Sequence, residues 1–129
     1  MGDTEPATYL AGACNIGPAE IALRRRIGWV ALVATALLLG AALWLDLSRW
    51  WRLTLALPAT VSASGFLQAR HHFCVGFARR GVFNFRAVGH VDAVIDESAR
   101  ANDRRTANRL TGFAVAIALL AAVVAVAIR

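Results

Sequence analysis

The stretch Asn-Ile-Gly-Pro-Ala-Glu-Ile-Ala-Leu-Arg-Arg-Arg, residues 15–26, leads directly into 19 uncharged residues, 27–45. Pro18 suits the first position of a helix, because its missing N–H would have no partner there. Glu20 lies where a carboxylate meets the positive end of the helix dipole. It also precedes Arg24 by four residues, the favourable order for an ion pair within a helix. We therefore predict a helix that begins at Pro18.

The uncharged run 27–45 is long enough to cross a lipid bilayer. At about 1.5 Å per residue it covers roughly the 30 Å hydrocarbon layer. Trp29 and Trp44 lie near its two ends, at the depth of the headgroups. Further apolar runs occupy residues 53–69 and 110–128. A buried helix of a soluble α-domain is the alternative, but three such runs in 129 residues leave too little polar surface to cover them.

Composition favours a membrane protein. Hydrophobic residues make up 58% of the chain, which is high for a soluble domain. The formal net charge is +6, and all 14 basic residues are arginine. These arginines gather at the ends of the apolar runs, which favours lipid headgroups over nucleic acid as their partner.

The predicted fold class is all-α integral membrane: an antiparallel transmembrane helical hairpin and a third transmembrane helix, preceded by a cytoplasmic amphipathic helix. The predicted parts are a flexible N-terminal tail (1–14), the transmembrane hairpin domain (15–80), a cytoplasmic connector with the amphipathic helix (81–109) and the third transmembrane helix (110–128). The turn between the first two spans, residues 46–52, is too short for anything except an antiparallel hairpin.

Small residues four apart predict the packing surfaces of the spans, because they let membrane helices approach closely. The third run carries such a stripe at Ala114, Ala118 and Ala122. Pro58 predicts a kink in the second span. A polar pathway for a permeant is the alternative interpretation of that span. The residues predicted to pack helices are Ala36, Gly40, Ser64, Gly65 and Ala69.

The connector after the second span alternates phenylalanines with cations and imidazoles, a mixture that suits the membrane interface. We expect residues 73–86 to be irregular or re-entrant. Lipid headgroups are predicted to contact Arg24, Arg25, Arg26, Arg79, Arg80 and Arg86.

A helix is predicted to resume at about Val91, with Val94 and Ile95 on one face and an ion pair between Asp96 and Arg100. Continued into the third run, it becomes one helix of over 30 residues.

The distribution of arginine predicts the topology. Eleven of the 14 arginines lie in the first 26 residues and in residues 70–109. By the positive-inside rule both segments are cytoplasmic and the C-terminus lies outside, in a bacterial inner membrane. Cys14 and Cys74 are then both in the cytosol, where thiols stay reduced.

Two cysteines and two histidines form a candidate set of soft metal ligands: Cys14, His71, His72 and Cys74. The alternative is that vicinal histidines beside phenylalanine serve only as interfacial anchors. Apart from a soft metal ion at this set, no cofactor is predicted. Cys74 by itself, near Arg79 and Arg80, is a candidate reactive thiol.

Several of these features together resemble a known family. Asn15-Ile-Gly17, the arginine cluster with Gly28, the tight hairpin, Gly65-Phe and Cys74 are similar to the YgaP-like two-helix transmembrane domain, over residues 14–80. That family occurs in bacterial inner-membrane proteins, alone or fused to a rhodanese sulfurtransferase domain. The resemblance implies an inner-membrane location near sulfur or thiocyanate handling.

The chain departs from that pattern in three respects. Val75 stands where the family often has proline, no rhodanese domain is present, and the helix from Val91 and the third span are additional. Sulfur transfer belongs to the rhodanese domain, so the resemblance implies no such activity here.

No catalytic constellation is recognisable, and no enzyme activity is predicted. The apolar runs lack charge, which argues against a proton- or ion-coupled transporter. The expected function is a small non-catalytic multi-pass protein that packs with itself or a larger membrane complex. One alternative is a conduit or sensor for sulfur species, thiol-reactive agents or soft metal ions, using Cys74 with His71 and His72. A second alternative is a module that binds anionic lipid headgroups.

Overall fold

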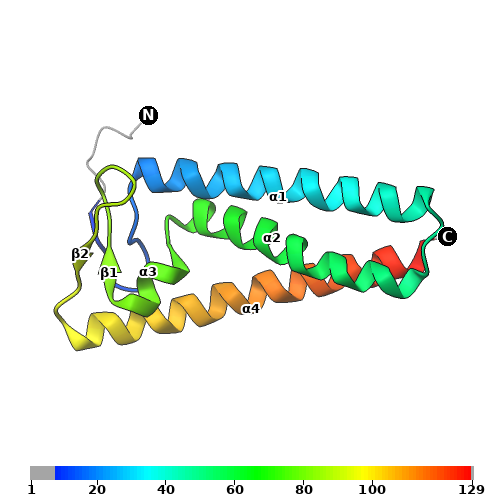
Figure 1. Cartoon of the computed structure of the whole chain (residues 1–129). Coiled ribbons are helices and arrows are strands. Elements are labelled where there is room, and N and C mark those ends of the chain that lie inside the picture. Colours follow the sequence, from blue (N-terminus) through cyan, green and yellow to red (C-terminus); the bar gives the residue numbers. More distant parts are fainter. Residues whose placement is uncertain (1–7, 129) are drawn as a thin grey trace.

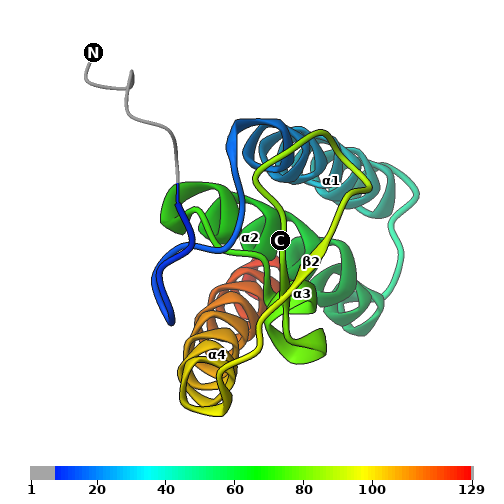
Figure 2. The same ribbon diagram turned by 90° about the vertical axis from the view of Figure 1, so that its left-hand side faces the viewer.

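A computed structural model describes residues 8–128 and shows a bundle of long helices with a small capping region at one end (Figure 1). The elements in order are α1 (Pro18–Trp44), the 3₁₀ helix η1 (Arg49–Leu55), α2 (Ala56–His71), α3 (Val75–Arg80), β1 (Val82–Phe83), β2 (Asp92–Ala93) and α4 (Glu97–Ala127). The short elements α3, β1 and β2 gather at the end where α1 and α4 begin (Figures 1 and 2).

The predicted start of α1 is confirmed. Pro18 is the first helical residue, and Gly17 is the cap with an extended backbone. The predicted ion pair is also present, with 3.0 Å between Arg24 Nη1 and Glu20 Oε1. A Cβ atom at Gly17 would lie 3.0 Å from the Cα atom of Phe85, so the close approach of these two segments favours glycine.

Helix α2 packs against both α1 and α4. On the α1 side, a Cβ atom on Gly65 would lie 2.8 Å from the carbonyl oxygen of Arg24, and one on Gly28 would lie 3.0 Å from the ring of Phe66. Ser62 Oγ donates a hydrogen bond of 2.9 Å to the Gly28 carbonyl. The buried face of α4 after its first turns is mostly alanine, including the predicted stripe: Ala107, Leu110, Ala114, Ala118, Ala122 and Ala125. Small side chains thus set the spacing of all three helices.

Two helices, α1 and α4, are long and apolar enough to cross a membrane by length and composition. Many of their large apolar side chains face outward; Leu37 is 68% exposed and Leu120 is 66% exposed. The predicted second span, residues 53–69, is divided between the end of η1 and the 16-residue α2. A crossing by this segment stays a prediction.

The kink predicted at Pro58 stays a prediction. Pro58 lies in the first turn of α2, which follows directly after the 3₁₀ helix η1, so the helix type changes within one turn of this proline.

The predicted helix start at Val91 is wrong, because α4 begins at Glu97. Val94 and Ile95 do not share a face: Val94 is 3% exposed and Ile95 is 90% exposed. Asp96 caps the helix by accepting a 3.2 Å hydrogen bond from the Ala99 amide. Arg100 Nε donates to the Val94 carbonyl at 2.5 Å and forms no ion pair with Asp96. From Glu97 onward the prediction of one long helix is confirmed, since α4 has 31 residues.

Residues 8–14 pack on α4, so the prediction of a flexible tail is wrong for them; residues 1–7 lie outside the described part. Tyr9 Oη donates to Asp103 Oδ2 at 2.7 Å, and the Gly12 amide donates to Asp103 Oδ1 at 2.6 Å. Thr106 Oγ1 donates to the Gly12 carbonyl at 2.7 Å. Burial raises the pKa of the Tyr9 hydroxyl, and its hydrogen bond to Asp103 raises it further.

Residues 73–86, predicted to be irregular or re-entrant, contain the short helix α3 and the strand β1, and their entry into a bilayer stays a prediction. Helix α3 ends at Arg80 and is capped by Gly81, which has a left-handed φ of 70°. Strand β1 pairs antiparallel with β2, with Val82 opposite Ala93. This small hairpin closes the end of the bundle over the loop that carries Cys74.

Candidate functional site

Cys74 lies at the junction of α2 and α3. Helix α2 ends at His71. Its C-cap His72 has a left-handed φ of 54° that redirects the chain, and Phe73 then lies in the core with no exposed surface. Cys74 is the N-terminal cap of α3 and is 4% exposed. Its Sγ atom accepts a hydrogen bond of 3.4 Å from the Phe77 amide.

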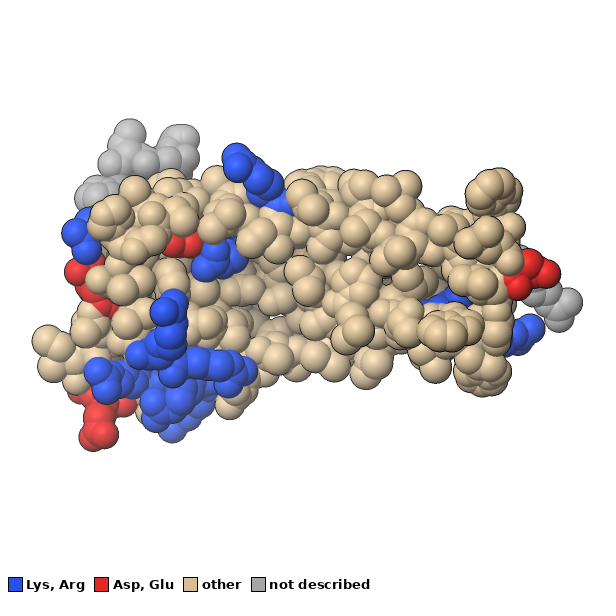
Figure 3. Space-filling model, viewed as in Figure 1, with Lys and Arg blue, Asp and Glu red and all other residues tan. Residues whose placement is uncertain are grey.

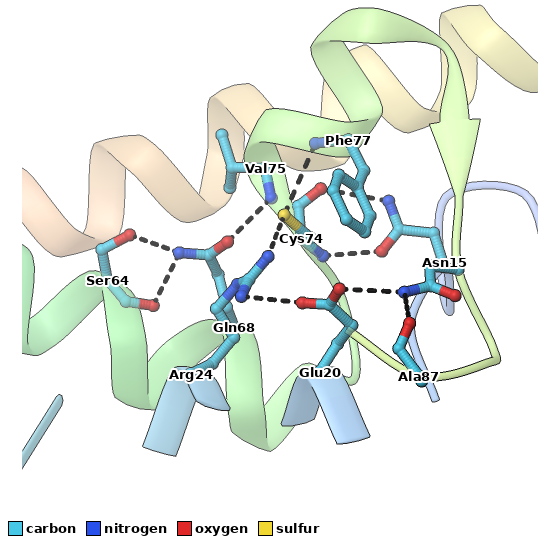
Figure 4. A network of polar contacts seen from close by, with 10 residues as sticks. Asn15, Glu20, Arg24, Ser64, Gln68, Cys74, Val75, Phe77 and Ala87 are labelled. Atoms are coloured by element: carbon cyan, nitrogen blue, oxygen red, sulfur yellow. Dashed lines mark hydrogen bonds and ion pairs between the residues drawn. The ribbon is translucent and has the colours of Figure 1, made fainter. Parts of the chain in front are cut away.

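The fully buried side chain of Asn15 holds the backbone of Cys74 (Figure 4). Asn15 Nδ2 donates to the Cys74 carbonyl at 3.0 Å, and the Cys74 amide donates to Asn15 Oδ1 at 2.6 Å. The backbone amide of Asn15 also donates to the His72 carbonyl at 3.1 Å. These three hydrogen bonds join the segment before α1 to the loop after α2, so they fix the position of the thiol.

A chain of polar contacts leads from Cys74 into α1 (Figure 4). Arg24 Nη2 donates to Cys74 Sγ at 2.9 Å, and Arg24 Nη1 pairs with Glu20 Oε1. The other carboxylate oxygen, Glu20 Oε2, accepts from Asn84 Nδ2 at 2.9 Å. A guanidinium and a backbone amide therefore both donate to the sulfur.

Gln68 supports the same loop from α2. Its Oε1 atom accepts a 2.9 Å hydrogen bond from the Val75 amide, and its Nε2 atom donates to Ser64 Oγ at 2.7 Å. A surface pocket of about 320 Å³ lies along this side of the bundle and is lined by Arg24, Ile27, Thr60, Val61, Ser64, Gly65 and Gln68. Arg24 thus lines this pocket and also donates a hydrogen bond to Cys74.

The predicted set of four metal ligands is not assembled. The Cys14 thiol contacts the Ile16 carbonyl at 3.8 Å, and burial raises the pKa of this thiol. His71 and His72 are exposed, whereas Cys74 is buried. Within residues 8–128 no group of three or more His, Cys, Asp or Glu side chains is placed to hold a metal ion. Cys14 and Cys74 are both free thiols.

The residues predicted to pack helices divide into two groups. Gly65 contacts α1, and Ser64 bonds to Gln68. Ala69 is 2% exposed. Ala36 and Gly40 lie on the outward face of α1, and a Cβ atom on Gly40 would meet nothing within 4 Å in the described chain.

The arginines predicted to contact lipid headgroups also divide. Five of the six are exposed: Arg25, Arg26, Arg79, Arg80 and Arg86. Arg24 is the exception, because its guanidinium is used by Glu20 and Cys74. Figure 3 shows arginines gathered at the end of the bundle that contains α3 and the start of α4. Arg79 is held there by Asn108 and Thr111.

Sequence reasoning missed the buried polar residues that organise the site. Asn15, Asn84 and Asp103 have no exposed surface. Their partners lie far away in the chain, and no local spacing marks them. Comparison with protein-family models, curated proteins and solved structures finds no match to this chain.

Proposed function

We propose that this chain is a small, non-catalytic, multi-pass protein of the bacterial inner membrane that assembles with a second copy or with a larger membrane complex. The observation that carries the proposal is the outward face of α1. There Ala36 and Gly40 leave a notch that no other part of the described chain fills. Small residues four apart are the surface that membrane helices use for close approach.

The exposed apolar side chains support a membrane location. Contiguous apolar surface of this extent along α1 and α4 is unfavourable in water, at roughly 25 cal/mol per Å². Trp44, Trp50 and Trp51 are exposed at one end of the bundle, and most arginines lie at the other. In the proposed topology, α1, the η1–α2 segment and α4 each cross the bilayer, and the arginine-rich end is cytoplasmic.

The assembly proposal is tested by Gly40→Leu, which fills the notch without touching the rest of the chain. Gly112→Leu is the matched control, because Gly112 is an exposed glycine on α4 that also has no neighbour within 4 Å. Sedimentation of the full chain in mild detergent should show a smaller assembly for Gly40→Leu and no change for Gly112→Leu. Unchanged size for Gly40→Leu would contradict the proposal, and loss with Gly112→Leu alone would move the interface to α4.

The topology is tested separately with reporters. A reporter fused after Arg129 should be active only outside the cytosol, and one fused before Met1 only inside. A cytosolic reporter at the C-terminus, or a purified chain that stays dispersed in buffer without amphiphile, would contradict three crossings.

A second candidate function is a sensor of thiol-reactive sulfur species, and the contact between Arg24 and Cys74 favours it. The proposed likeness of residues 14–80 to the YgaP-like domain is consistent with such a setting. Although Cys74 is only 4% exposed, a thiol that acts as a sensor should still be labelled by a small alkylating reagent in inverted vesicles at neutral pH. This labelling should be slowed by Arg24→Gln and abolished by Cys74→Ser. Cys14→Ser serves as the control. Slow labelling of Cys74 in the unaltered chain would exclude this candidate.

A further inference from the structure

Arg52 is a buried arginine at the end of the bundle away from Cys74. It lies in η1, is 7% exposed and contacts the last turn of α4. Its Nη1 atom donates to the carbonyl oxygens of Ala125, at 2.9 Å, and of Ile128. Cations stabilise the C-terminal end of a helix, where the carbonyl groups lack partners. Nη1 of Arg52 therefore caps the C-terminal end of α4.

The other edge of the same guanidinium, formed by Nε–H and Nη2–H, donates no hydrogen bond to residues 8–128. Arg52 Nε is buried and has no hydrogen-bond acceptor in the described chain, and Nη2 donates to none of residues 8–128. Nε–H and Nη2–H point the same way and form the fork that pairs with two oxygens of one oxyanion. A buried N–H without an acceptor is unfavourable, so this edge is suited to a ligand that supplies one.

A surface pocket of about 540 Å³ adjoins Arg52, and its lining also includes three other polar residues, Asp46, Ser48 and Arg49, together with Leu47 and Ile128. Arg49 adds a second guanidinium, which is exposed. Ser48 caps η1 by position, but its hydroxyl makes no capping hydrogen bond and is available as a donor. Asp46 is the acidic residue of this lining and is exposed.

We propose that this pocket binds a phosphate oxyanion. The Nε/Nη2 edge of Arg52 pairs with two phosphate oxygens, Arg49 supplies the second positive charge and Ser48 donates its hydroxyl. Asp46 opposes binding through its like charge. Exposed Trp50 and Trp51 flank the site, as aromatic residues do at the headgroup level of a bilayer. The source of the phosphate is accordingly a phospholipid headgroup, and this assignment rests on the proposed membrane location. Free inorganic phosphate offers the same chemistry but does not depend on a membrane.

The test uses the full chain in uncharged detergent, titrated with short-chain phosphatidylglycerol and, in a parallel arm, with inorganic phosphate. Binding is followed by phosphorus NMR and by native mass spectrometry. Arg49→Gln should weaken binding about tenfold or more, and Arg52→Lys, which keeps the charge but removes the fork, should do the same. Asp46→Asn should tighten it. Arg104→Gln, an equal loss of charge at an exposed arginine near the start of α4, is the matched control and should change little.

Each outcome bears on the site. Selective binding of phosphatidylglycerol supports a headgroup site, and equal binding of inorganic phosphate supports a free phosphate ligand at the same residues. If Arg52→Lys loses helical circular dichroism, Arg49→Gln and Asp46→Asn decide the result. Absence of binding in both arms, or an equal loss with Arg104→Gln, would overturn the proposal. The sedimentation of Gly40→Leu is independent of this pocket, so failure here leaves the assembly proposal standing.

Discussion

Arg24 Nη2 lies 2.9 Å from Cys74 Sγ, across a separation of 50 residues in sequence. The contact joins the first turns of α1 to the loop between α2 and α3. Since the same guanidinium pairs with Glu20, it is fixed from two sides and presents a constant donor to the sulfur. The run of three arginines in α1 therefore has two roles: Arg25 and Arg26 face outward, whereas Arg24 belongs to the interior of the capped end.

Asn15→Ala should destabilise the fold by about 2–4 kcal/mol, because it leaves the buried amide and carbonyl of Cys74 without partners. Asn108→Ala is the control: Asn108 is exposed and bonds only to Arg79 among the described residues, so its loss should cost under about 0.5 kcal/mol. Denaturation in mild detergent, followed by circular dichroism, measures both. Equal stability of the two variants would show that the Asn15 contacts do not hold the loop.

Gly65→Ala should destabilise the bundle by about 1–3 kcal/mol, because the added Cβ atom would lie 2.8 Å from the backbone oxygen of Arg24 and would push α1 away from α2. Gly112→Ala, at an exposed glycine of α4, should instead be neutral or stabilising by up to about 1 kcal/mol, since alanine is the better helix former and a Cβ atom there meets nothing within 4 Å in the described chain. Thermal unfolding of the pair gives the comparison. A stable Gly65→Ala variant would contradict the close approach of the helices.

Tyr9 is the only tyrosine, so the ultraviolet absorbance of tyrosinate reports its ionisation directly. Its pKa should lie above the ordinary value of 10.0, chiefly because of burial and then because of the hydrogen bond to Asp103. Asp103→Asn should lower this pKa toward the ordinary value. An unshifted titration in the unaltered chain would contradict the packing of residues 8–14.

The same shift predicts how stability depends on pH. The unfolded chain ionises Tyr9 at a lower pH than the folded chain does. The un-ionised Tyr9 therefore makes its full contribution to the free energy of unfolding at every pH below the pKa of the unfolded chain. It is then lost as the pH rises from about 10 through the raised folded pKa. Tyr9→Phe should remove this part of the alkaline destabilisation. Identical alkaline profiles for the two proteins would exclude it.

Asp96→Ala should cost about 1 kcal/mol, because the Ala99 amide loses its cap at the start of α4. Asp92→Ala removes an equal charge nearby but breaks only the exposed pair with Arg86, which should contribute at most about 1 kcal/mol and less in high salt. The salt dependence of unfolding separates the two effects. A strongly salt-dependent loss in Asp96→Ala would indicate that Asp96 acts through charge and not as a cap.

Features set by neighbouring residues were predictable from the sequence. The start of α1 at Pro18 and the ion pair of Glu20 with Arg24 depend on contacts within one turn of helix, so spacing alone predicts them. The Ala114 stripe of α4 follows equally from a repeat of four residues. Two apolar helices of membrane length follow from composition.

The candidate site was not predictable in the same way, because its contacts join distant residues. Asn15 bonds to Cys74, 59 residues later, and Tyr9 bonds to Asp103, 94 residues later. The error at Val91 has a local cause: the Val94 amide bonds to the Gly81 carbonyl, so pairing with the preceding strand overrides a spacing that also fits a helix. Arg24 was assigned to lipid because it belongs to a cluster of three arginines at the end of an apolar run, whereas its partner thiol lies in another element.

The hydrogen bond between Tyr9 and Asp103 sets an order for biosynthesis. Residues 8–14 leave the ribosome before α4 does, and they can pack on α4 only after residue 103 has been translated. A nascent intermediate that stops short of α4 therefore lacks the partner of Tyr9 and Gly12. The packing of residues 8–14 is thus a late folding event that depends on the synthesis of α4.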